Sequence, residues 1–261
     1  MKRSKPTDTI SYGEAGSQVC DLYLPEGSGP HPVVVLVHGG FWRSMYDRTL
    51  MAPLARDLSE RGYAAWNIEY RRVGERGGGW PGTFEDVAEA VDALSALPEG
   101  VADLDRVVGV GHSSGGHLAL WVGARPGLPG SEPGGRPVVR FAAVVAQAAV
   151  CDLKAAAVPG IGRSSTVELM GASPEDDPDL YALASPIERL PLGIPQLLVH
   201  GRSDHLVPVE QSLRYAQRAA AAGDPVELLA LSRVGHFDVI KPRHHSWKAV
   251  TDRLPGLMES L

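Results

Sequence analysis

The apolar residues of this 261-residue chain occur in short continuous runs that alternate with stretches of helical spacing. Val33–Val37 is apolar at every position, which is typical of a strand covered on both faces. Leu50–Arg61 instead spaces its apolar residues three or four apart, as one face of a helix requires, and stops at Gly62. This alternation predicts an α/β protein with a mostly parallel central sheet and helices on both faces.

The same reasoning places further strands and helices along the chain. Gln18–Leu24 alternates polar and apolar residues and is expected to be a half-exposed edge strand. The other expected strands are Thr9–Tyr12, Tyr63–Tyr70, Arg106–Val110, Phe141–Val150, Pro195–His200 and Val226–Leu231. The other expected helices are Thr83–Leu97 with Thr83 as its N-cap, Ser114–Ala124, Val209–Ala222 and the tail Arg243–Leu261, which Pro255 interrupts.

No repeat or linker divides the sequence, so residues 1–261 are expected to form a single domain. The segment 152–192 breaks the alternation because it is rich in Ala, Pro and Asp. It contains only short helical pieces, near Thr166–Met170 and Leu180–Leu183. We therefore interpret 152–192 as a small cap inserted before the strand that precedes Asp204.

A Gly-x-Ser-x-Gly sequence, Gly111–Gly115, joins the expected strand Arg106–Val110 to the helix that follows it. Its two glycines allow strand and helix backbones to approach at a turn where a Cβ atom would clash. Such a turn leaves the hydroxyl of Ser113 exposed at its apex, as a nucleophile requires. The motif is short and arises by chance in a chain rich in Gly and Ser, so it needs support from elsewhere.

A serine nucleophile needs a base, and the base needs an acid to orient it. His236 is the predicted base because it lies in a short loop after a strand. Asp204 is the predicted acid because it follows a buried strand and precedes a helix. The other histidines weighed as base are His117, His200, His205, His244 and His245, and the other acids are Asp152, Asp176, Asp177, Asp179, Asp224 and Asp238.

The negative oxygen of a tetrahedral intermediate needs backbone N–H donors. The amide of Ser114, directly after the expected nucleophile, is one predicted donor. Gly39 and Gly40 are expected to supply the others, because a glycine backbone can approach a bound oxygen closely. His38, which precedes them, is expected to hold this loop by hydrogen bonds.

The order Ser113, Asp204, His236 is the order found in α/β-hydrolases, and the chain resembles that superfamily over essentially its whole length. Gly111–Gly116 together with His38–Trp42 resembles the hormone-sensitive-lipase-like esterases. The sequence is still more similar to the arylformamidase (kynurenine formamidase) branch, which tends to have an aromatic residue and Trp after His-Gly-Gly. Asn67–Arg71 and Ser185-Pro186 are also similar to motifs of this group. The resemblance implies an acyl-enzyme mechanism that needs no cofactor and uses Ser113, Asp204 and His236.

Four aromatic residues follow expected strands or lie in the loops near this edge of the sheet. They are candidates for the walls of a substrate pocket, although aromatic residues in such places pack loops equally often. These candidates are Phe41, Trp42, Tyr70 and Trp80.

Composition narrows the possible partners and location. A net charge of −6, spread along the chain, favours solubility and argues against nucleic acid as a partner. Cys20 and Cys151 are expected to be buried thiols, and no spacing of His and Cys indicates a metal site. The basic start of the chain leads into no apolar core, and no apolar run is long enough to span a membrane. A cytoplasmic enzyme without membrane contact is therefore expected.

The predicted function is hydrolysis of small carboxylic esters by a serine hydrolase. Three alternatives stay open: hydrolysis of an aryl formamide such as N-formylkynurenine, acyl transfer or cyclisation in a biosynthetic pathway, and ligand binding without catalysis. The sequence leaves the acyl group, the leaving group and the oligomeric state open.

Overall fold

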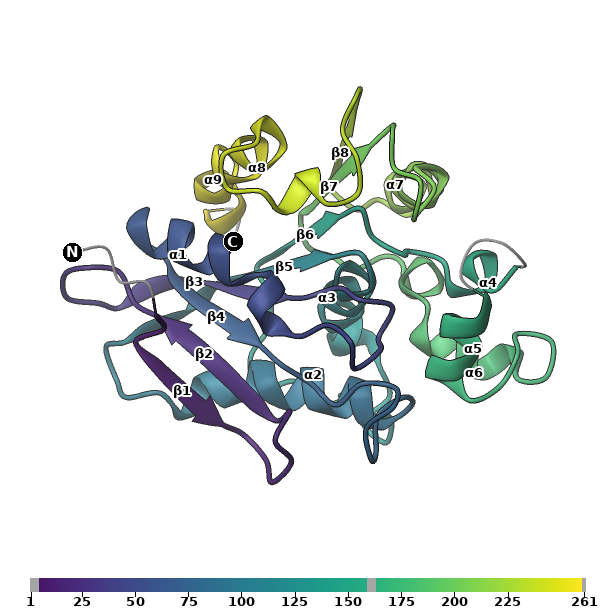
Figure 1. The fold of residues 1–261 in the computed structure, drawn as a ribbon, viewed down its shortest axis with the longest axis horizontal. Coiled ribbons are helices and arrows are strands. Elements are labelled where there is room, and N and C mark those ends of the chain that lie inside the picture. The colour runs from purple at the N-terminus through teal and green to yellow at the C-terminus, as the bar shows by residue number, and fades with distance from the viewer. Residues whose placement is uncertain (1–4, 159–162, 260–261) are drawn as a thin grey trace.

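A mixed sheet of eight strands organises the fold in the computed structural model, which describes residues 5–158 and 163–259 (Figure 1). The strand order is β1-β2-β4-β3-β5-β6-β7-β8. β1 and β2 are antiparallel to their neighbours, whereas the strands from β4 to β8 in this order run parallel. The strands are β1 (Asp8–Ser11), β2 (Val19–Tyr23), β3 (His31–Val37), β4 (Ala64–Ile68), β5 (Ala102–His112), β6 (Ala143–Gln147), β7 (Gln196–Gly201) and β8 (Val226–Leu231).

Helices cover both faces of the sheet, as the alternation of patterns predicts (Figure 1). One face packs against α2 (Gly82–Asp92), α3 (Ser114–Ala124) and α7 (Glu210–Ala221). The other packs against α1 (Ala52–Glu60), α8 (His245–Thr251) and α9 (Leu254–Met258). Between β6 and β7 lie α4 (Leu153–Ala156), α5 (Arg163–Met170) and α6 (Pro178–Ala184), at the right of Figure 1. Short 3-10 helices occupy Arg48–Leu50, Ala93–Ala96, Arg125–Gly127, Pro186–Arg189 and Asp238–Ile240.

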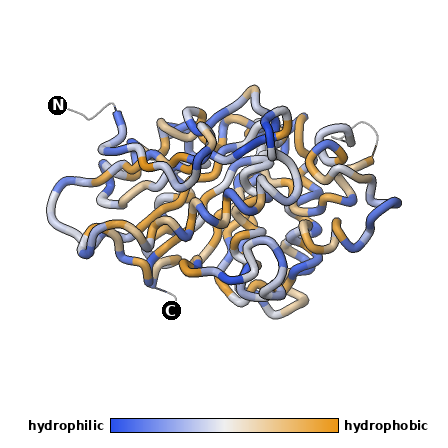
Figure 2. Tube along the Cα trace, turned by 90° about the horizontal axis from the view of Figure 1, so that it is seen from below, coloured by the Kyte–Doolittle hydropathy of each residue, from blue (hydrophilic) through white to orange (hydrophobic). Residues whose placement is uncertain are grey.

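The continuous apolar run of β3 supplies both hydrophobic layers. Val33, Val35 and Val37 face the layer that contains α2 and α3. Val34 and Leu36 face the layer that contains α1 and α8. Figure 2 shows the resulting concentration of hydrophobic positions in the interior of the trace. The inference of a doubly covered strand from an uninterrupted apolar run is confirmed.

The prediction that Gln18–Leu24 forms an edge strand is wrong. β1 forms the edge, and β2 lies between β1 and β4. Asp21, which reads as a solvent-facing position, is buried and accepts hydrogen bonds from the Arg48 guanidinium at 2.9 and 3.2 Å. A carboxylate paired with arginine can occupy an interior position that an alternating pattern assigns to solvent.

Several boundaries differ from the expected ones because local hydrogen bonds decide them. β5 begins at Ala102, because Ala102 and Asp103 pair with His31 and Pro32 at the start of β3, and the exposed residues 104–106 that follow interrupt the apolar pattern. The α4 helix was not expected, and the Asp152 carboxylate caps it by accepting the Ala155 N–H at 2.9 Å. Pro255 lies in the first turn of α9, where a proline is tolerated. Thr83 lies inside α2 and is not its N-cap.

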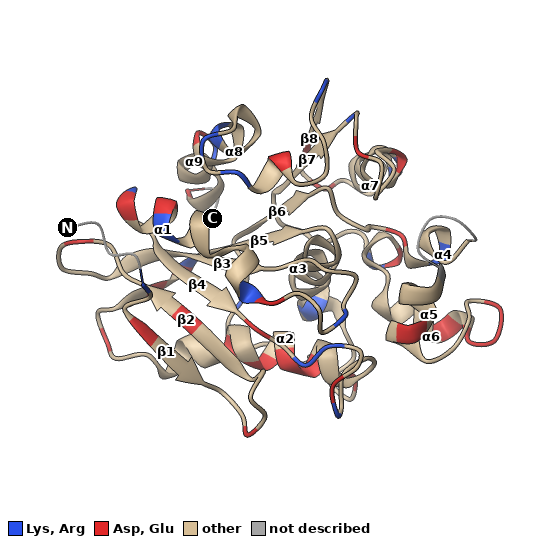
Figure 3. Ribbon diagram, in the orientation of Figure 1, with Lys and Arg blue, Asp and Glu red and all other residues tan. Residues whose placement is uncertain are grey.

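Charged and sulfur-containing residues take ordinary positions in this fold. Lys, Arg, Asp and Glu are distributed over helices and loops at many places around the sheet (Figure 3). Cys20 and Cys151 are free and buried, as expected. Within the described part of the chain, no helix has the length and apolar character needed to cross a membrane.

The turn between β5 and α3 brings three backbones together. Ser113 stands between the two elements with φ 56° and ψ −121°. A Cβ atom on Gly111 would lie 2.1 Å from the Gly115 carbonyl oxygen, and one on Gly115 would lie 2.2 Å from the Val37 carbonyl oxygen. Because these neighbours are backbone atoms that cannot rotate away, only glycine fits at either position. The sharp turn that the motif predicts is therefore present.

Gly115→Ala is expected to lower the free energy of unfolding by about 1–3 kcal/mol, because the added methyl group forces backbone atoms apart. Urea denaturation measures this change. Gly127→Ala is the matched control, since a Cβ atom there meets nothing within 4 Å. Equal unfolding free energies for the two variants would contradict this account of the turn.

Candidate active site

The non-glycine residues with positive φ mark one edge of the sheet. In residues 5–158 and 163–259 they all follow the carboxyl end of a strand: Phe41 and Trp42 follow β3, Ser113 follows β5, Ala148 follows β6 and Arg233 follows β8. Each such conformation costs on the order of 1 kcal/mol or more and persists only where surrounding contacts hold it. This edge is also where ligands bind in sheets of this kind.

The predicted base and acid are hydrogen-bonded to each other at this edge. The Nδ1–H of His236 donates to Oδ2 of Asp204 at 2.7 Å. Both side chains are almost fully buried. This bond fixes the orientation of the imidazole ring through Nδ1, so Nε2 is the nitrogen that can act as a base. The structure thus brings together two residues that are 32 positions apart in the chain.

Asp204 is held as an ionised carboxylate. Burial opposes ionisation, but hydrogen bonds from His200, His236 and the Val207 N–H outweigh it and keep the pKa of this carboxyl well below its usual range. Oδ1 accepts the N–H groups of Leu206 and Val207 at 2.8 and 2.9 Å. The same residue thereby orders its own loop and orients His236.

His200 lies behind the acid. Its Nε2 is 3.3 Å from Oδ2 of Asp204 and 3.0 Å from the Val207 carbonyl oxygen. Its Nδ1 is 2.8 Å from the Ser212 hydroxyl, which can donate to it. His200 is completely buried, so it supports Asp204 and does not face a substrate.

His112, directly before Ser113, connects the turn between β5 and α3 to the loop of His236. Its Nε2–H donates to the His236 carbonyl oxygen at 3.0 Å, and the two rings lie with centroids 4.6 Å apart. Burial and, to a smaller extent, the neighbouring His236 lower the pKa of His112 to about 3, so His112 stays neutral near pH 7. The sequence reasoning missed this role, although the position of His112 beside the nucleophile could have indicated it.

Gln147 at the end of β6 makes a second connection. Its carbonyl oxygen accepts the Ser113 N–H at 2.8 Å. Its side-chain amide donates to the Val239 carbonyl oxygen at 2.6 Å, three residues after His236. His112 and Gln147 therefore both connect the turn at Ser113 to the segment 236–239 that contains His236. These contacts attach the loop of His236 to the strand ends that hold Ser113.

The loop after β3 lies against the turn at Ser113, as is required if Gly39 and Gly40 are to donate N–H groups to an oxyanion there. A Cβ atom on Gly39 would lie 2.9 Å from Ser113 Cβ and 2.7 Å from the His112 carbonyl oxygen. The Trp42 N–H is directed at the Ser114 hydroxyl at 3.4 Å. Within the described residues, no hydrogen bond uses the amide of Gly40 or of Ser114. These amides are available as donors beside Ser113.

A buried polar cluster supports this loop from below. His38 Nε2 bonds to Oε1 of Glu69 at 2.8 Å, which confirms that His38 holds the loop through hydrogen bonds. Tyr70 stacks on the His38 ring at 4.5 Å and donates its hydroxyl proton to the His38 carbonyl oxygen at 2.8 Å. Burial raises the pKa of Tyr70 well above its ordinary value, so the phenol keeps that proton.

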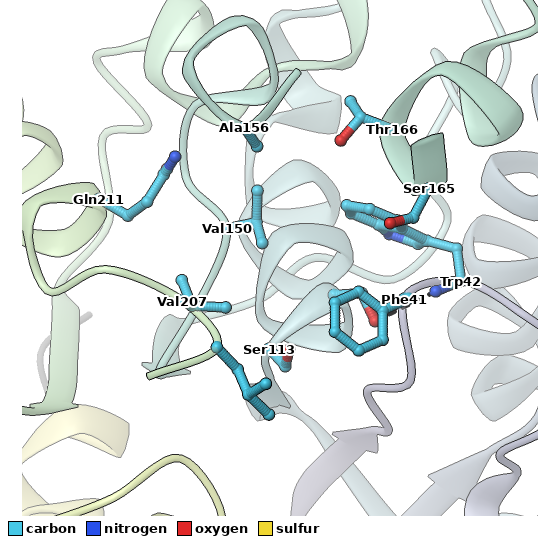
Figure 4. A pocket seen from close by; sticks show the side chains of 11 residues that line it. Phe41, Trp42, Ser113, Val150, Ala156, Ser165, Thr166, Val207 and Gln211 are labelled. Carbon is cyan, nitrogen blue, oxygen red and sulfur yellow. Dashed lines mark hydrogen bonds between the residues drawn. The ribbon is translucent and has the colours of Figure 1, made fainter. Parts of the chain in front are cut away.

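A small cavity opens beside Ser113 (Figure 4). Its walls are mostly apolar, and Figure 4 shows Ser165 and Thr166 on one side and Val207 and Gln211 on the other. The lining residues are Phe41, Trp42, Ser113, Ser114, Val150, Ala156, Ser165, Thr166, Leu206, Val207 and Gln211.

Two of the four aromatic candidates line this cavity, Phe41 and Trp42. Tyr70 does not, because it is fully buried beneath His38. Trp80 packs edge-on against Phe84 with ring centroids 4.8 Å apart, so it too lies outside the lining. The sequence pattern placed all four near one edge but could not distinguish loop packing from pocket wall.

Trp42 reaches beyond the cavity to His117. Its indole Nε1–H donates to Nδ1 of His117 at 3.2 Å, and Nε2 of His117 donates to the Ala184 carbonyl oxygen at 2.9 Å. Burial lowers the pKa of His117 to about 4. His117 therefore joins the loop of Trp42 to the end of α6 as a neutral ring.

The remaining candidates hold local structure. Asp238 accepts the Gly235 N–H at 2.8 Å and pairs with Lys241, which shapes the loop of His236. Asp224 accepts the N–H groups of Leu192 and Gly193 at 2.8 Å each.

Over the described ranges, no three His, Cys, Asp or Glu side chains cluster in a way that could hold a metal ion.

With this geometry established, known proteins offer a comparison. The family model described as BD-FAE matches residues 20–218, which is most of the chain. The chain belongs to the BD-FAE family. The matched range includes Ser113 and Asp204, whereas His236 lies beyond its end.

Two curated relatives of this BD-FAE member come from Mycobacterium tuberculosis (strain ATCC 25618 / H37Rv). The probable carboxylic ester hydrolase LipM is 29% identical over 247 residues, a match that covers 88% of this chain and 56% of LipM. Esterase LipC is 28% identical over 258 residues, covering 88% of this chain and 60% of LipC. The chain thus spans little more than half the length of these relatives.

Solved structures show the fold. A truncated carbohydrate esterase from gut microbiota superposes with a TM-score of 0.85 at 22% identity, covering 98% of both chains. The propionate-bound esterase Est2 of Thermogutta terrifontis superposes with a TM-score of 0.79 at 20% identity, covering 99% of this chain and 97% of Est2. The BD-FAE member has the α/β-hydrolase fold.

Because His117 is buried with a pKa lowered from 6.5 to about 4, the unfolded chain binds more protons between these pH values. The contribution of neutral His117 to the free energy of unfolding is complete above pH 6.5 and is lost as the pH falls to about 4. His117→Gln can keep both hydrogen bonds without titrating. We expect it to reduce the acid-induced loss of unfolding free energy in this window by about 3 kcal/mol.

Urea denaturation at a series of pH values measures this effect. The exposed His245 provides the control variant, His245→Gln, which should keep the pH dependence of the wild type. An unchanged pH dependence in His117→Gln would show that His117 is not the buried neutral ring described above.

Proposed function

We propose that this protein hydrolyses small carboxylic esters through an acyl-enzyme formed on Ser113. The observation that carries the proposal is the buried 2.7 Å hydrogen bond between His236 and Asp204, in a loop attached to the residue before Ser113. The relatives LipM and LipC, named as ester hydrolases, support the same reaction class. We also propose a cytoplasmic location, which rests on composition alone.

In the proposed reaction, Ser113 Oγ attacks the ester carbonyl carbon while Nε2 of His236 takes the hydroxyl proton. The positive charge that forms on His236 is stabilised by the ionised Asp204 carboxylate. The same proton then passes to the oxygen of the departing alcohol, which leaves the acyl group on Ser113. A water molecule, deprotonated by His236, releases the acid and restores the serine. Side chains, backbone amides and water suffice for these steps.

The proposed oxyanion site consists of backbone N–H groups from Gly39, Gly40 and Ser114. The close packing of Gly39 on Ser113 and the unused amides of Gly40 and Ser114 support this assignment. The Trp42 N–H is engaged by the Ser114 hydroxyl, which leaves the donors to the residues before it in the loop. Each such donor contributes about 3–4 kcal/mol to stabilisation of the transition state.

The segment 152–192 is proposed to act as a cap on a single domain. It supplies Ala156, Ser165 and Thr166 to the cavity wall, beside the strand ends that carry the proposed nucleophile. The small cavity and its apolar lining fit a small acyl group. The substrates we propose are therefore small esters and not long-chain lipids.

Arylformamide hydrolysis would use the same serine, base and amides, and so would acyl transfer to an amine or alcohol. Among the described residues that line the cavity, none favours either reaction over ester hydrolysis. Comparing kcat/KM for N-formylkynurenine and for short acyl esters separates the first alternative. Product analysis with competing nucleophiles separates the second.

Ser113→Ala is expected to lower kcat on p-nitrophenyl acetate by about 10⁴- to 10⁶-fold, because the proposed acyl-enzyme forms on the hydroxyl that this change removes. Steady-state kinetics with purified protein measure the loss. The variant should unfold at the same urea concentration as the wild type.

A fluorophosphonate probe provides the matching control, since it should label the wild type at Ser113 and leave Ser113→Ala unlabelled. Turnover by the variant at the wild-type rate would refute the assignment of the nucleophile. Failure of the wild type to react with the probe would instead favour a ligand-binding protein on the same fold.

A further inference from the structure

An ion pair links the loop after β3 to α5, the two segments that supply Trp42 and Thr166 to the cavity wall. Arg43 Nε lies 2.8 Å from Oε2 of Glu168, and its terminal nitrogen lies 2.9 Å from Oε1. The same nitrogen of Arg43 donates to the Ser164 hydroxyl at 3.2 Å. We call Arg43, Ser164 and Glu168 the clasp. Its bidentate geometry fixes direction as well as distance.

The Arg43 end of the clasp belongs to residues 38–43, which carry the proposed oxyanion donors Gly39 and Gly40 and which we call the oxyanion loop. The Arg43 N–H donates to the Gly40 carbonyl oxygen at 3.0 Å, which closes the turn around Phe41 and Trp42. The Val73 N–H donates to the Trp42 carbonyl oxygen at 2.8 Å and anchors this turn to the neighbouring segment. This end of the clasp is therefore firmly attached to the site.

The Glu168 end lies on α5, which has buried residues in both of its halves. At the carboxyl end of α5, Leu169 and Met170 are buried in the core, and the Leu169 carbonyl oxygen accepts the Trp80 N–H at 2.7 Å. The amino-terminal half carries Ser165 and Thr166, which form the cavity wall opposite Val207 (Figure 4). The clasp ties this half to the oxyanion loop.

The substrate part that this cavity receives is the acyl group. The leaving alcohol must lie beside His236, because His236 returns the proton to it. His236 and its neighbour Phe237 are not among the lining residues, whereas Ser113, Ser114 and the oxyanion loop are. A substrate bound with its carbonyl at Ser113 therefore directs its alcohol toward His236 and its acyl chain into the cavity.

We propose that the clasp limits the length of the acyl chain by holding the amino-terminal half of α5 against the cavity. This inference rests on the proposed ester hydrolysis and adds its specificity: short-chain acyl esters, with Arg43 and Glu168 as the residues that set the limit. Neither side chain touches the reacting atoms. Ser165 and Thr166 are buried and make further interactions of their own, so release of the clasp is expected to loosen this wall and lengthen the space available to the chain without unfolding the helix.

The test compares kcat/KM for p-nitrophenyl octanoate and acetate in the wild type, Arg43→Glu, Glu168→Arg and the double variant. Each single reversal places like charges face to face and is expected to raise the octanoate-to-acetate ratio by about 5-fold or more. The double variant restores an ion pair and should return the ratio to within about 2-fold of the wild type. A structural disturbance unrelated to the pair would not be rescued in this way.

A matched ion pair on the far side of the protein controls for surface charge. Arg253 and Glu227 form the same bidentate geometry, at 2.8 and 2.7 Å, with side chains 36% and 49% exposed against 34% and 43% for Arg43 and Glu168. Arg253→Glu and Glu227→Arg should leave the octanoate-to-acetate ratio unchanged. A change of the ratio in these controls equal to that in the clasp variants would overturn the proposal.

Covalent labelling separates this inference from the proposed function. The rates at which fluorophosphonates with methyl and octyl chains react with Ser113 report cavity length without any turnover. The proposal predicts that clasp reversal raises the octyl-to-methyl rate ratio and that the double variant restores it. Unchanged ratios in both assays would overturn the clasp proposal and leave ester hydrolysis intact. Altered labelling ratios without ester turnover by the wild type would contradict ester hydrolysis and support the clasp.

Discussion

The turn at Ser113 has no room for a side chain at Gly111 or Gly115, and this constraint determines the arrangement around it. Backbone atoms of β3, β5 and α3 meet at Gly111 and Gly115 within the contact distance of a single Cβ atom. Because the turn cannot relax, it presents the Ser113 hydroxyl and the first free amide of α3 in one fixed direction. The other functional groups are positioned relative to this point.

The groups around the turn are held mainly by buried neutral histidines and backbone carbonyl oxygens. His112 holds the carbonyl of His236, and His117 accepts from Trp42 of the oxyanion loop. Burial lowers the pKa of both rings, so neither becomes charged near pH 7. The ionised Asp204 is the buried charge beside the proposed base, where it can stabilise the imidazolium that forms during the reaction. This division matches the chemistry, because charge lies where the reaction develops charge.

The sequence predicted the features that depend on local pattern. The apolar runs located the buried strands, and the bounds of α3 and β8 agree with those expected from the pattern. The Asp204–His236 contact followed from strand ends and residue type, because parallel strands bring their carboxyl ends to one edge. Features set by distant contacts escaped prediction. Asp21 is buried because Arg48 pairs with it. Tyr70 stacks on His38 and so does not line the cavity. His112 bonds to a loop 124 residues away in the chain.

The central claim is that Ser113 is a nucleophile facing a backbone oxyanion site and a short acyl cavity. A crystal structure of the protein after reaction with a short-chain alkyl fluorophosphonate tests it most directly. We expect phosphorus bonded to Ser113 Oγ, its free oxygen about 3 Å from the amide nitrogens of Gly40 and Ser114, and the alkyl chain between Trp42 and Thr166. An adduct whose oxygen points away from these amides, or phosphorus bonded to another residue, would contradict it.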